Sequence, residues 1–451
     1  MGRLFGTDGV RGIANRELTC ERALEIGRAA ASVLANGSRR RPIFVIGTDT
    51  RASSDMLAAA IAAGLCSVGA DVQLLGVVPT PAVAFLVGKY KADAGVMISA
   101  SHNPAEYNGI KIFSGDGYKL PDALEEQIEA IVLDHVLEPD APIGGEVGRI
   151  TTCPNAVADY VEHLKSTAAY SLDGLHIAVD CANGSASVTA EKLFIELGAE
   201  CHFLSHNPDG VNINRNCGST HLDALRAYVL EHQLDAGVAF DGDADRCLCI
   251  DDQGELIDGD RIMAICAADM AERGKLTRNT VVGTIMTNFG FGKFCEANGL
   301  QFVATKVGDR FVLEQMLQDN YALGGEQSGH VIFRDFATTG DGQLTAIQLL
   351  SLMRRKQAKL SDLAQIMTRY PQVMVNLHIS NEGKLQFYTN PAIKAAMEEA
   401  KRALGDSGRI VVRPSGTEPL IRVMTEGMDH AQIESVARSV ASVIEQELGK
   451  L

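Results

Sequence analysis

The stretch of sequence that decides the fold is ADAGVMISASHNP, residues 92–104. Its apolar run Val96–Ile98 predicts a short buried strand, and the Asn-Pro pair at its end predicts a turn directly afterwards. The segment LDAGVAFDGD at 234–243 resembles it, and NYALGGE at 320–326 is a fainter third copy. Each copy is an apolar strand followed by polar residues. Because ligands of open α/β sheets bind at the carboxyl ends of the strands, we expect three different loops to face one cleft.

Three longer blocks accompany these copies and share one pattern. They occupy residues 43–77, 176 to about 201, and 280–305, and each reads as strand, turn, helix, strand. This pattern is typical of a βαβ unit with parallel strands. Together with the repeated segments, it predicts three related α/β domains with parallel or mixed sheets.

The C-terminal part of the chain follows another pattern. Strands are expected at 373–379, 408–416 and 420–427, with amphipathic helices around 391–404 and 430–448. This mixture predicts a smaller α+β domain.

A length of 451 residues suits three or four domains. Prolines near 139–142 and 371, and a glycine at 254, mark the expected joints. The expected domains are therefore 1–150, 151–253, 254–370 and 371–451.

Composition excludes several classes of protein. Hydrophobic residues make up 46% of the chain and charged residues 22%, as in globular proteins with large cores. No apolar run approaches the about 18 residues of a membrane span, and the N-terminus lacks a signal peptide, so we expect a cytoplasmic protein without a membrane partner. The net charge of −16 argues against nucleic-acid binding but leaves anionic small ligands open. The ten cysteines lack framework spacing, so we expect them to be reduced and mostly buried.

Asp241, Asp243 and Asp245 follow the second copy of the strand on one tight loop. Three carboxylates at alternate positions repel one another unless a hard cation lies among them, and Mg²⁺ suits such a set because it leaves positions for phosphate oxygens. An EF-hand is excluded, because Arg246 stands where its glycine is required and Asp252 where its glutamate is required. The alternatives are a phosphatase-type nucleophile at Asp241 and a solvated acidic turn.

Ser101 and His102 lie on the loop after the first copy. Taken alone, Ser-His-Asn-Pro is equally compatible with an ordinary turn. Beside the aspartate loop it suggests a function, because a phosphorylated Ser101 would offer an oxygen to Mg²⁺ from one domain while the aspartates hold the ion from the next. His102 either assists proton transfer or forms a local hydrogen bond.

The motif RPSGTEP, followed by Arg422, is expected to bind phosphate. Gly416 lets backbone N–H groups approach an anion, Ser415 and Thr417 donate hydroxyls, and Arg413 suits bidentate contact. A plain turn with solvated arginines is the alternative.

Three further motifs offer polar groups to the same cleft. The glycine-rich loop at 324–330 exposes Glu326 and Ser328, which suit sugar hydroxyls or an amine, with a flexible turn as the alternative. Arg11, in FGTDGVRG, would stabilise a transferring phosphoryl group. Lys111, in NGIKIF, is either a general base whose pKa is lowered by burial beside arginines, or a lysine at the edge of a strand.

Five of these motifs together resemble the α-D-phosphohexomutase superfamily. In chain order they are FGTDGVRG, SASHNP, DGDADR, GEQSGH and RPSGTEPLIR, and they span nearly the whole chain. Gln327 in the fourth motif and the segment NPDGVNINRNCGSTH at 207–221 are similar to the glucosamine-type members, the bacterial phosphoglucosamine mutases. Pro414 departs from the serine expected in many of these and leaves the phosphate-binding residues intact.

The resemblance implies three related α/β domains and a smaller α+β domain around a central cleft. It implies the interconversion of glucosamine 6-phosphate and glucosamine 1-phosphate through a bound bisphosphate, supplying UDP-N-acetylglucosamine synthesis. A covalent phosphate on Ser101 and one Mg²⁺ per chain are implied, the ion being held by Ser101, Asp241, Asp243 and Asp245. The implied catalytic residues are Ser101, His102, Lys111, Arg11 and Arg246. The implied substrate-binding residues are Glu326, Ser328, Gly308, Arg310, Arg413, Ser415, Gly416, Thr417 and Arg422.

Three other functions make different predictions. A phosphomannomutase/phosphoglucomutase would prefer glucose or mannose phosphates. A phosphohydrolase with Asp241 as nucleophile would release inorganic phosphate and stay active after Ser101→Ala. A catalytically silent sugar-phosphate sensor would need neither metal nor phosphoserine. The expected partner is a small sugar phosphate, with a homodimer as the candidate assembly.

Overall fold

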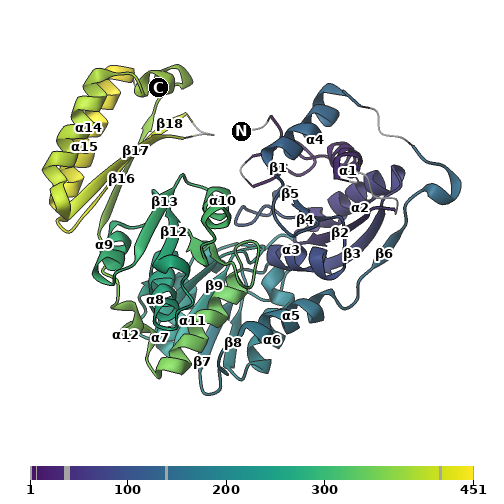
Figure 1. Ribbon diagram of the computed structural model, residues 1–451, viewed down its shortest axis with the longest axis horizontal. Coiled ribbons are helices and arrows are strands. Elements are labelled where there is room, and N and C mark those ends of the chain that lie inside the picture. The colour runs from purple at the N-terminus through teal and green to yellow at the C-terminus, as the bar shows by residue number, and fades with distance from the viewer. Residues whose placement is uncertain (1–2, 7, 35–40, 138–140, 416–418, 450–451) are drawn as a thin grey trace.

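The computed structural model describes residues 3–6, 8–34, 41–137, 141–415 and 419–449. These residues form four β-sheets, of six, five, four and three strands, that follow one another along the chain (Figure 1). Among them, no helix combines the length and the apolar composition needed to cross a membrane.

The first sheet has the strand order β1-β5-β4-β2-β3-β6, in which β5 runs antiparallel to both of its neighbours. Its elements are β1 (Val10–Ile13), α1 (Cys20–Leu34), β2 (Ile43–Thr48), α2 (Ala52–Ser67), β3 (Asp71–Val77), α3 (Thr80–Lys89), β4 (Ala94–Ile98), β5 (Tyr107–Ser114), α4 (Asp122–Asp134) and β6 (Ile150–Thr152).

The second sheet has the order β11-β10-β9-β7-β8, and the third has the order β13-β12-β14-β15. We call the parts of the chain that carry the four sheets the first to fourth segments. The elements of the second segment are α5 (Ala156–Thr167), β7 (His176–Asp180), α6 (Ala190–Glu196), β8 (Glu200–Leu204), α7 (Asp223–His232), β9 (Ala236–Phe240), β10 (Cys247–Asp251) and β11 (Leu256–Ile257). Those of the third are α8 (Gly259–Glu272), β12 (Thr280–Thr284), α9 (Phe289–Ala297), β13 (Gln301–Thr305), α10 (Asp309–Asp319), β14 (Leu323–Gly325), β15 (Val331–Phe333), α11 (Gly342–Lys356) and α12 (Leu360–Ala364).

The three sheets share a four-strand unit, which confirms the predicted repetition. Its order is β5-β4-β2-β3 in the first sheet, β10-β9-β7-β8 in the second and β15-β14-β12-β13 in the third. In each unit three strands are parallel and the fourth returns as an antiparallel hairpin. The repeated sequence segments are β4, β9 and β14, whose residues are all buried, as expected of strands covered on both faces. The hairpin turn after each of these strands is therefore the loop that faces the cleft.

Helix starts follow local sequence signals. Asp341 caps α11 by accepting a hydrogen bond from the backbone N–H of Leu344 at 2.9 Å, and Asp258 caps α8 in the same way. Helix α3 begins with proline in its first turn, where a missing N–H costs nothing.

An apolar cluster joins the first three segments, and the first segment has a second cluster of its own. The shared cluster contains Val45, Val179 and Leu350, which come from the first, second and third segments. Helix α11 packs against both α5 and β10 of the second segment, and Tyr160 on α5 donates a 2.7 Å hydrogen bond to Asp341 at the start of α11. These segments therefore form one continuous body.

The fourth sheet forms a smaller α+β unit, as predicted. Its strand order is β16-β18-β17, fully antiparallel, and α14 and α15 cover one face (Figure 1). Its elements are β16 (Gln372–His378), α13 (Asn381–Phe387), α14 (Pro391–Leu404), β17 (Gly408–Pro414), β18 (Leu420–Gly427) and α15 (His430–Leu448). A separate apolar cluster fills this unit, so its core is independent of the main body.

Buried Glu426 on β18 joins the fourth unit to the third. Its carboxylate accepts hydrogen bonds from Arg409 at 2.5 Å and from the side chain of Asn288 at 3.1 Å. The backbone N–H of Phe289 donates to the same carboxylate at 3.1 Å. Polar contacts therefore link the fourth unit to the third, in contrast to the apolar packing among the first three segments.

Candidate active site

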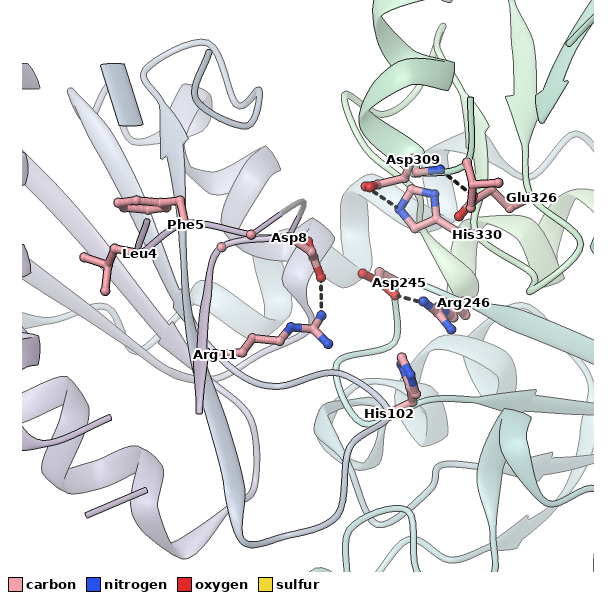
Figure 2. Close-up of a pocket in the computed structure, with 14 residues that line it drawn as sticks. Leu4, Phe5, Asp8, Arg11, His102, Asp245, Arg246, Asp309, Glu326 and His330 are labelled. Atoms are coloured by element: carbon pink, nitrogen blue, oxygen red, sulfur yellow. Dashed lines mark hydrogen bonds and ion pairs between the residues drawn. The ribbon is translucent and has the colours of Figure 1, made fainter. Parts of the chain in front are cut away.

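The three hairpin loops meet at a cavity of about 540 Å³. His102 comes from the loop after β4, Asp245 and Arg246 from the loop after β9, and Glu326 and His330 from the loop after β14. Figure 2 shows Asp8 and Arg11 of the N-terminal segment across the cavity from these residues. The corresponding ends of three related sheets thus converge on one site.

Ser101 lies beside this cavity at the boundary between two segments. It is 1% exposed, and its hydroxyl donates a 2.6 Å hydrogen bond to Oδ2 of Asp241 on the second sheet. Its backbone has a left-handed φ of 53°, which is strained for a residue with a side chain. Nδ1 of His102 is 3.2 Å from the same hydroxyl. The serine oxygen is therefore held against the aspartate loop.

Asp241, Asp243 and Asp245 form a group suited to a metal ion. One carboxylate oxygen from each lies within 4.8 Å of the others, and all three residues are buried. Burial and the repulsion of Asp245 and Asp243 raise the pKa of Asp241 well above its usual value. Within the described part of the chain, one oxygen of Asp243 and one of Asp245 are buried without a hydrogen-bond partner. A hard divalent cation fits this set, because it would satisfy these oxygens and remove the repulsion.

Lys111 lies among carboxylates, whereas arginines were predicted beside it. It lies on β5, and its ammonium is 2.7 Å from Asp243, 3.0 Å from Asp8 and 3.4 Å from Asp245. Burial disfavours the charge, but these carboxylates outweigh it and raise the pKa of Lys111 well above its usual value. The prediction of a lowered pKa is therefore wrong for this structure, and Lys111 is a cation that neutralises the aspartate loop.

Arg11 and His102 face the cavity from the first segment (Figure 2). Arg11 donates to Oδ1 of Asn103 at 3.2 Å and pairs with Asp8. Burial, together with the nearby charges of Arg246 and Arg11, lowers the pKa of His102 to about 4. The imidazole is therefore neutral near pH 7.

The loop after β14 contributes a carboxylate and a hydroxyl. Glu326 accepts a 3.1 Å hydrogen bond from the backbone N–H of Gly308, and both residues line the cavity. The hydroxyl of Ser328 is buried and has no hydrogen-bond partner among the residues that the structure describes. Arg310 does not line the cavity, because its guanidinium is paired with Asp122, Glu125 and Glu314.

Four titratable residues of this site were not predicted. Lys119 pairs with Asp8, at 2.6 Å, and with Asp309, while His330 is 3.4 Å from Asp309. These contacts link the first and third segments across the cavity. Asp8 and His330 belong to quoted motifs, so the motifs carried a signal for these two, whereas Asp309 only adjoins Gly308, a residue expected at the substrate.

The fourth unit holds the predicted phosphate-binding arginines away from this cavity. Arg413 on β17 and Arg422 on β18 are directly paired across the strands. Burial and the neighbouring charge of Arg422 lower the pKa of Arg413. Ser415 follows β17, whereas Gly416 and Thr417 lie outside the described residues. None of the residues described here in the fourth unit lines the cavity, and the adjacent guanidinium groups form a cationic patch that an anion would stabilise.

Comparison with known proteins identifies the family. Four models of phosphoglucomutase/phosphomannomutase match the chain: α/β/α domains I, II and III at 2–136, 158–254 and 258–370, and the C-terminal domain at 374–443. The phosphoglucosamine mutase of Acetivibrio thermocellus is 51% identical over 449 residues, covering 100% of both chains. That of Caldanaerobacter subterraneus is 53% identical over 448 residues, covering 99% of this chain and 100% of the relative.

Solved structures show the same fold at low sequence identity. A phosphoglucomutase/phosphomannomutase family protein from Burkholderia thailandensis has a TM-score of 0.84 at 23% identity, covering 98% of this chain and 97% of its own. The Aspergillus fumigatus N-acetylphosphoglucosamine mutase, solved with GlcNAc-6P and magnesium, has a TM-score of 0.69 at 17% identity, covering 99% and 96%. With four matched domains and relatives about half identical over their full length, the chain belongs to the phosphoglucosamine mutase family of the α-D-phosphohexomutases.

Proposed function

We propose that this enzyme interconverts glucosamine 6-phosphate and glucosamine 1-phosphate by carrying a phosphoryl group on Ser101. The observation that carries the proposal is the 2.6 Å contact between the Ser101 hydroxyl and Asp241, one of three clustered carboxylates beside the cavity. The names of the half-identical relatives support the choice of sugar. The product would supply UDP-N-acetylglucosamine synthesis.

The reaction consists of two phosphoryl transfers in opposite directions. First, the phosphoryl group leaves Ser101 for the free hydroxyl of the sugar monophosphate, which gives a free serine and a bound bisphosphate. The sugar hydroxyl loses its proton, and the serine oxygen gains one as its bond to phosphorus breaks. After the bisphosphate turns over in the cleft, its other phosphoryl group returns to Ser101. The product is the isomeric monophosphate, and the enzyme is again phosphorylated.

Several side chains would stabilise the transferring group. Mg²⁺, bound by Asp241, Asp243, Asp245 and a phosphoserine oxygen, would neutralise the charge that develops on the phosphoryl oxygens. Arg11 and Arg246 would add positive charge from opposite sides of the cavity, and Lys111 would do so from β5.

The sugar and its second phosphate would bind further from Ser101. Glu326, Ser328 and the backbone of Gly308 would contact sugar hydroxyls. The loop of the fourth unit would hold the phosphate that does not react, through the residues Arg413, Ser415, Gly416, Thr417 and Arg422. Because the arginine pair lies outside the cavity, the fourth unit would have to approach the main body by bending at the joint near residue 371. Small-angle scattering tests this step, since an unchanged profile on adding substrate would contradict it.

The choice of sugar is tested by comparing kcat/KM for the 6-phosphates of glucosamine, glucose and mannose. A clear preference for glucosamine 6-phosphate is expected, with no release of inorganic phosphate. A preference for glucose or mannose would establish the phosphoglucomutase/phosphomannomutase alternative instead. Sustained release of inorganic phosphate would establish the phosphohydrolase.

Three further expectations accompany this function. We propose that the four segments 1–150, 151–253, 254–370 and 371–451 act as four domains, each with one functional loop. We also propose a cytoplasmic location and a homodimer. Sedimentation velocity at several protein concentrations tests the assembly, and cell fractionation tests the location.

A further inference from the structure

The backbone carbonyl oxygen of Ser101 accepts hydrogen bonds from two side chains on opposite sides of a segment boundary. Nη2 of Arg51, at the start of α2, lies 3.0 Å from it, and Nδ2 of Asn214, on the second segment, lies 2.9 Å from it. The same two side chains also donate to the carbonyl oxygen of Asn103, at 2.8 and 3.1 Å. The turn that holds Ser101 is thus bound from both sides.

The first of these donors is fixed within its own segment. The side chain of Arg51 is fully buried, and its Nε donates to Asp49 at 2.8 Å. The hydroxyl of Ser99, two residues before Ser101, donates to the same carboxylate at 2.6 Å. Arg51 therefore belongs to the rigid frame of the first sheet.

The second donor is fixed within the second segment. Asn214 is 7% exposed, has a left-handed φ of 58°, and donates its backbone N–H to the carbonyl oxygen of Ala182 at 2.9 Å. Asparagine tolerates this backbone conformation better than most residues. Asn214 therefore ties the position of the Ser101 turn to the sheet that carries the aspartate loop.

The aspartate loop touches the same carbonyl group. A Cβ atom on Gly242 would lie 2.5 Å from the carbonyl oxygen of Ser101 and 2.9 Å from Nδ2 of Asn214. Only glycine allows so close an approach between the two backbones. Asn214, Gly242 and the Ser101 carbonyl thus meet at one point, and Ser101 and the residue before Gly242, Asp241, form the 2.6 Å contact.

We infer that Asn214 is a positioning residue for phosphoryl transfer, which holds the Ser101 oxygen in register with the metal-binding carboxylates. The inference rests on the function proposed above for Ser101. The strained backbone of Ser101 would relax without this hydrogen bond, and a displacement of about 1 Å at a reacting atom costs about 10²-fold in rate. Asn214 does not line the cavity, so its loss should affect the chemical step and leave sugar binding intact.

Two substitutions test this role in the full-length protein. Asn214→Asp keeps the shape and the tolerance of a left-handed backbone but places an oxygen against the carbonyl groups of Ser101 and Asn103. Asn214→Gly removes the donor without adding a charge. For both we expect kcat to fall by about 10- to 100-fold, KM for glucosamine 6-phosphate to stay within about threefold, and the ³¹P resonance of phosphorylated Ser101 to shift.

Asn212→Asp is the matched control, because the Asn212 side chain bonds only within its own loop, to Asn207 and Asp209. It should keep the wild-type kcat and ³¹P resonance. The inference is overturned if the Asn214 variants keep the wild-type kcat, if only KM changes, if the control loses as much activity, or if both variants fail to fold, since Asn214 would then be structural. The wild-type rate in the same assay tests the proposed function separately: an inactive wild type refutes that function, whereas an active wild type with unaffected Asn214 variants refutes only this inference.

Discussion

The hydroxyl oxygen of Ser101 lies 2.6 Å from a carboxylate oxygen of Asp241, although 140 residues separate them along the chain. The two residues follow corresponding strands, β4 and β9, of two related sheets. Their contact places a hydroxyl and a cluster of buried carboxylates at one point beside the cavity. The proposed phosphoryl transfer and the proposed binding of Mg²⁺ both depend on this arrangement.

Ser101→Ala should abolish mutase activity, because it removes the hydroxyl that is held against Asp241 and proposed to carry the phosphoryl group. Loss of the nucleophile in a serine protease costs about 10⁶-fold in kcat, so we expect kcat to fall here by at least about 10⁴-fold. Intact-protein mass measurement should find one phosphate on the wild type and none on the variant. Ser187→Ala, a hydroxyl bonded only to Gly184 near the surface of the second segment, is the control and should retain both phosphate and activity. Activity that persists in Ser101→Ala would favour Asp241 as the nucleophile.

Mg²⁺ should stabilise the folded protein as well as activate it. The buried oxygens of Asp243 and Asp245 that accept no hydrogen bond gain a partner when the ion binds. A ligand at 100 times its Kd adds about 2.7 kcal/mol to the free energy of unfolding, which should appear as a higher Tm. Asp245→Asn should lose most of this rise, whereas Asp116→Asn, at an exposed position, should keep it. An equal rise in Tm for Asp245→Asn and the wild type would place the ion elsewhere.

Lys119→Met should destabilise the protein strongly, because it leaves Asp8 and Asp309 without their shared cation. The side chains of all three are mostly buried, and removing one partner of a buried pair costs about 3 kcal/mol or more. Urea unfolding of the single and double variants of Lys119→Met and Asp309→Asn should give a coupling energy, with the double variant losing less than the sum. Lys165→Met provides the comparison, since Lys165 bridges Glu162 and Glu196 at the surface and its loss should be far less destabilising. Strict additivity would show that the lysine does not couple the two segments.

Asp341→Asn should become more stabilising as the pH rises. Burial raises the pKa of Asp341 to about 6 in the folded protein, against an ordinary value of 3.8. Below about pH 4 the carboxyl is protonated in both states, so ionisation has no effect on stability there. Between pH 4 and 6 the unfolded chain ionises first, and the folded state loses up to about 3 kcal/mol, at about 1.4 kcal/mol per pKa unit.

The measurement is the difference in Tm between Asp341→Asn and the wild type, taken at pH 5 and at pH 8. It should be larger at pH 8, because asparagine can still cap α11 and bond to Tyr160 but never ionises. Asp429→Asn, at the exposed cap of α15, provides the control, for which little pH dependence is expected. A difference that stays constant with pH would show that the pKa of Asp341 is the same in the folded and unfolded protein, so that burial does not raise it.

The sequence by itself determined the repeated architecture and the kinds of side chains at the site. Apolar runs of strand length, each ending in polar residues, predicted β4, β9 and β14 and the loops that follow them. Local periodicity is sufficient here, because a strand buried on both faces has to be apolar wherever its sheet lies. The sequence also predicted a cation site at the aspartate loop, since three acidic residues on one turn repel one another in any fold.

Only the tertiary structure decided which charges meet. Lys111 was expected beside arginines, yet the pairing of β5 with β4 turns it toward three carboxylates and reverses the direction of its pKa shift. Arg310 was expected at the substrate but is paired with acidic groups of another segment. Nothing in the sequence around Asn214 indicated its hydrogen bond to Ser101. These outcomes depend on distances between residues more than 100 positions apart. Coulomb and hydrogen-bond energies change steeply over such contacts, so a local sequence pattern carries no information about them.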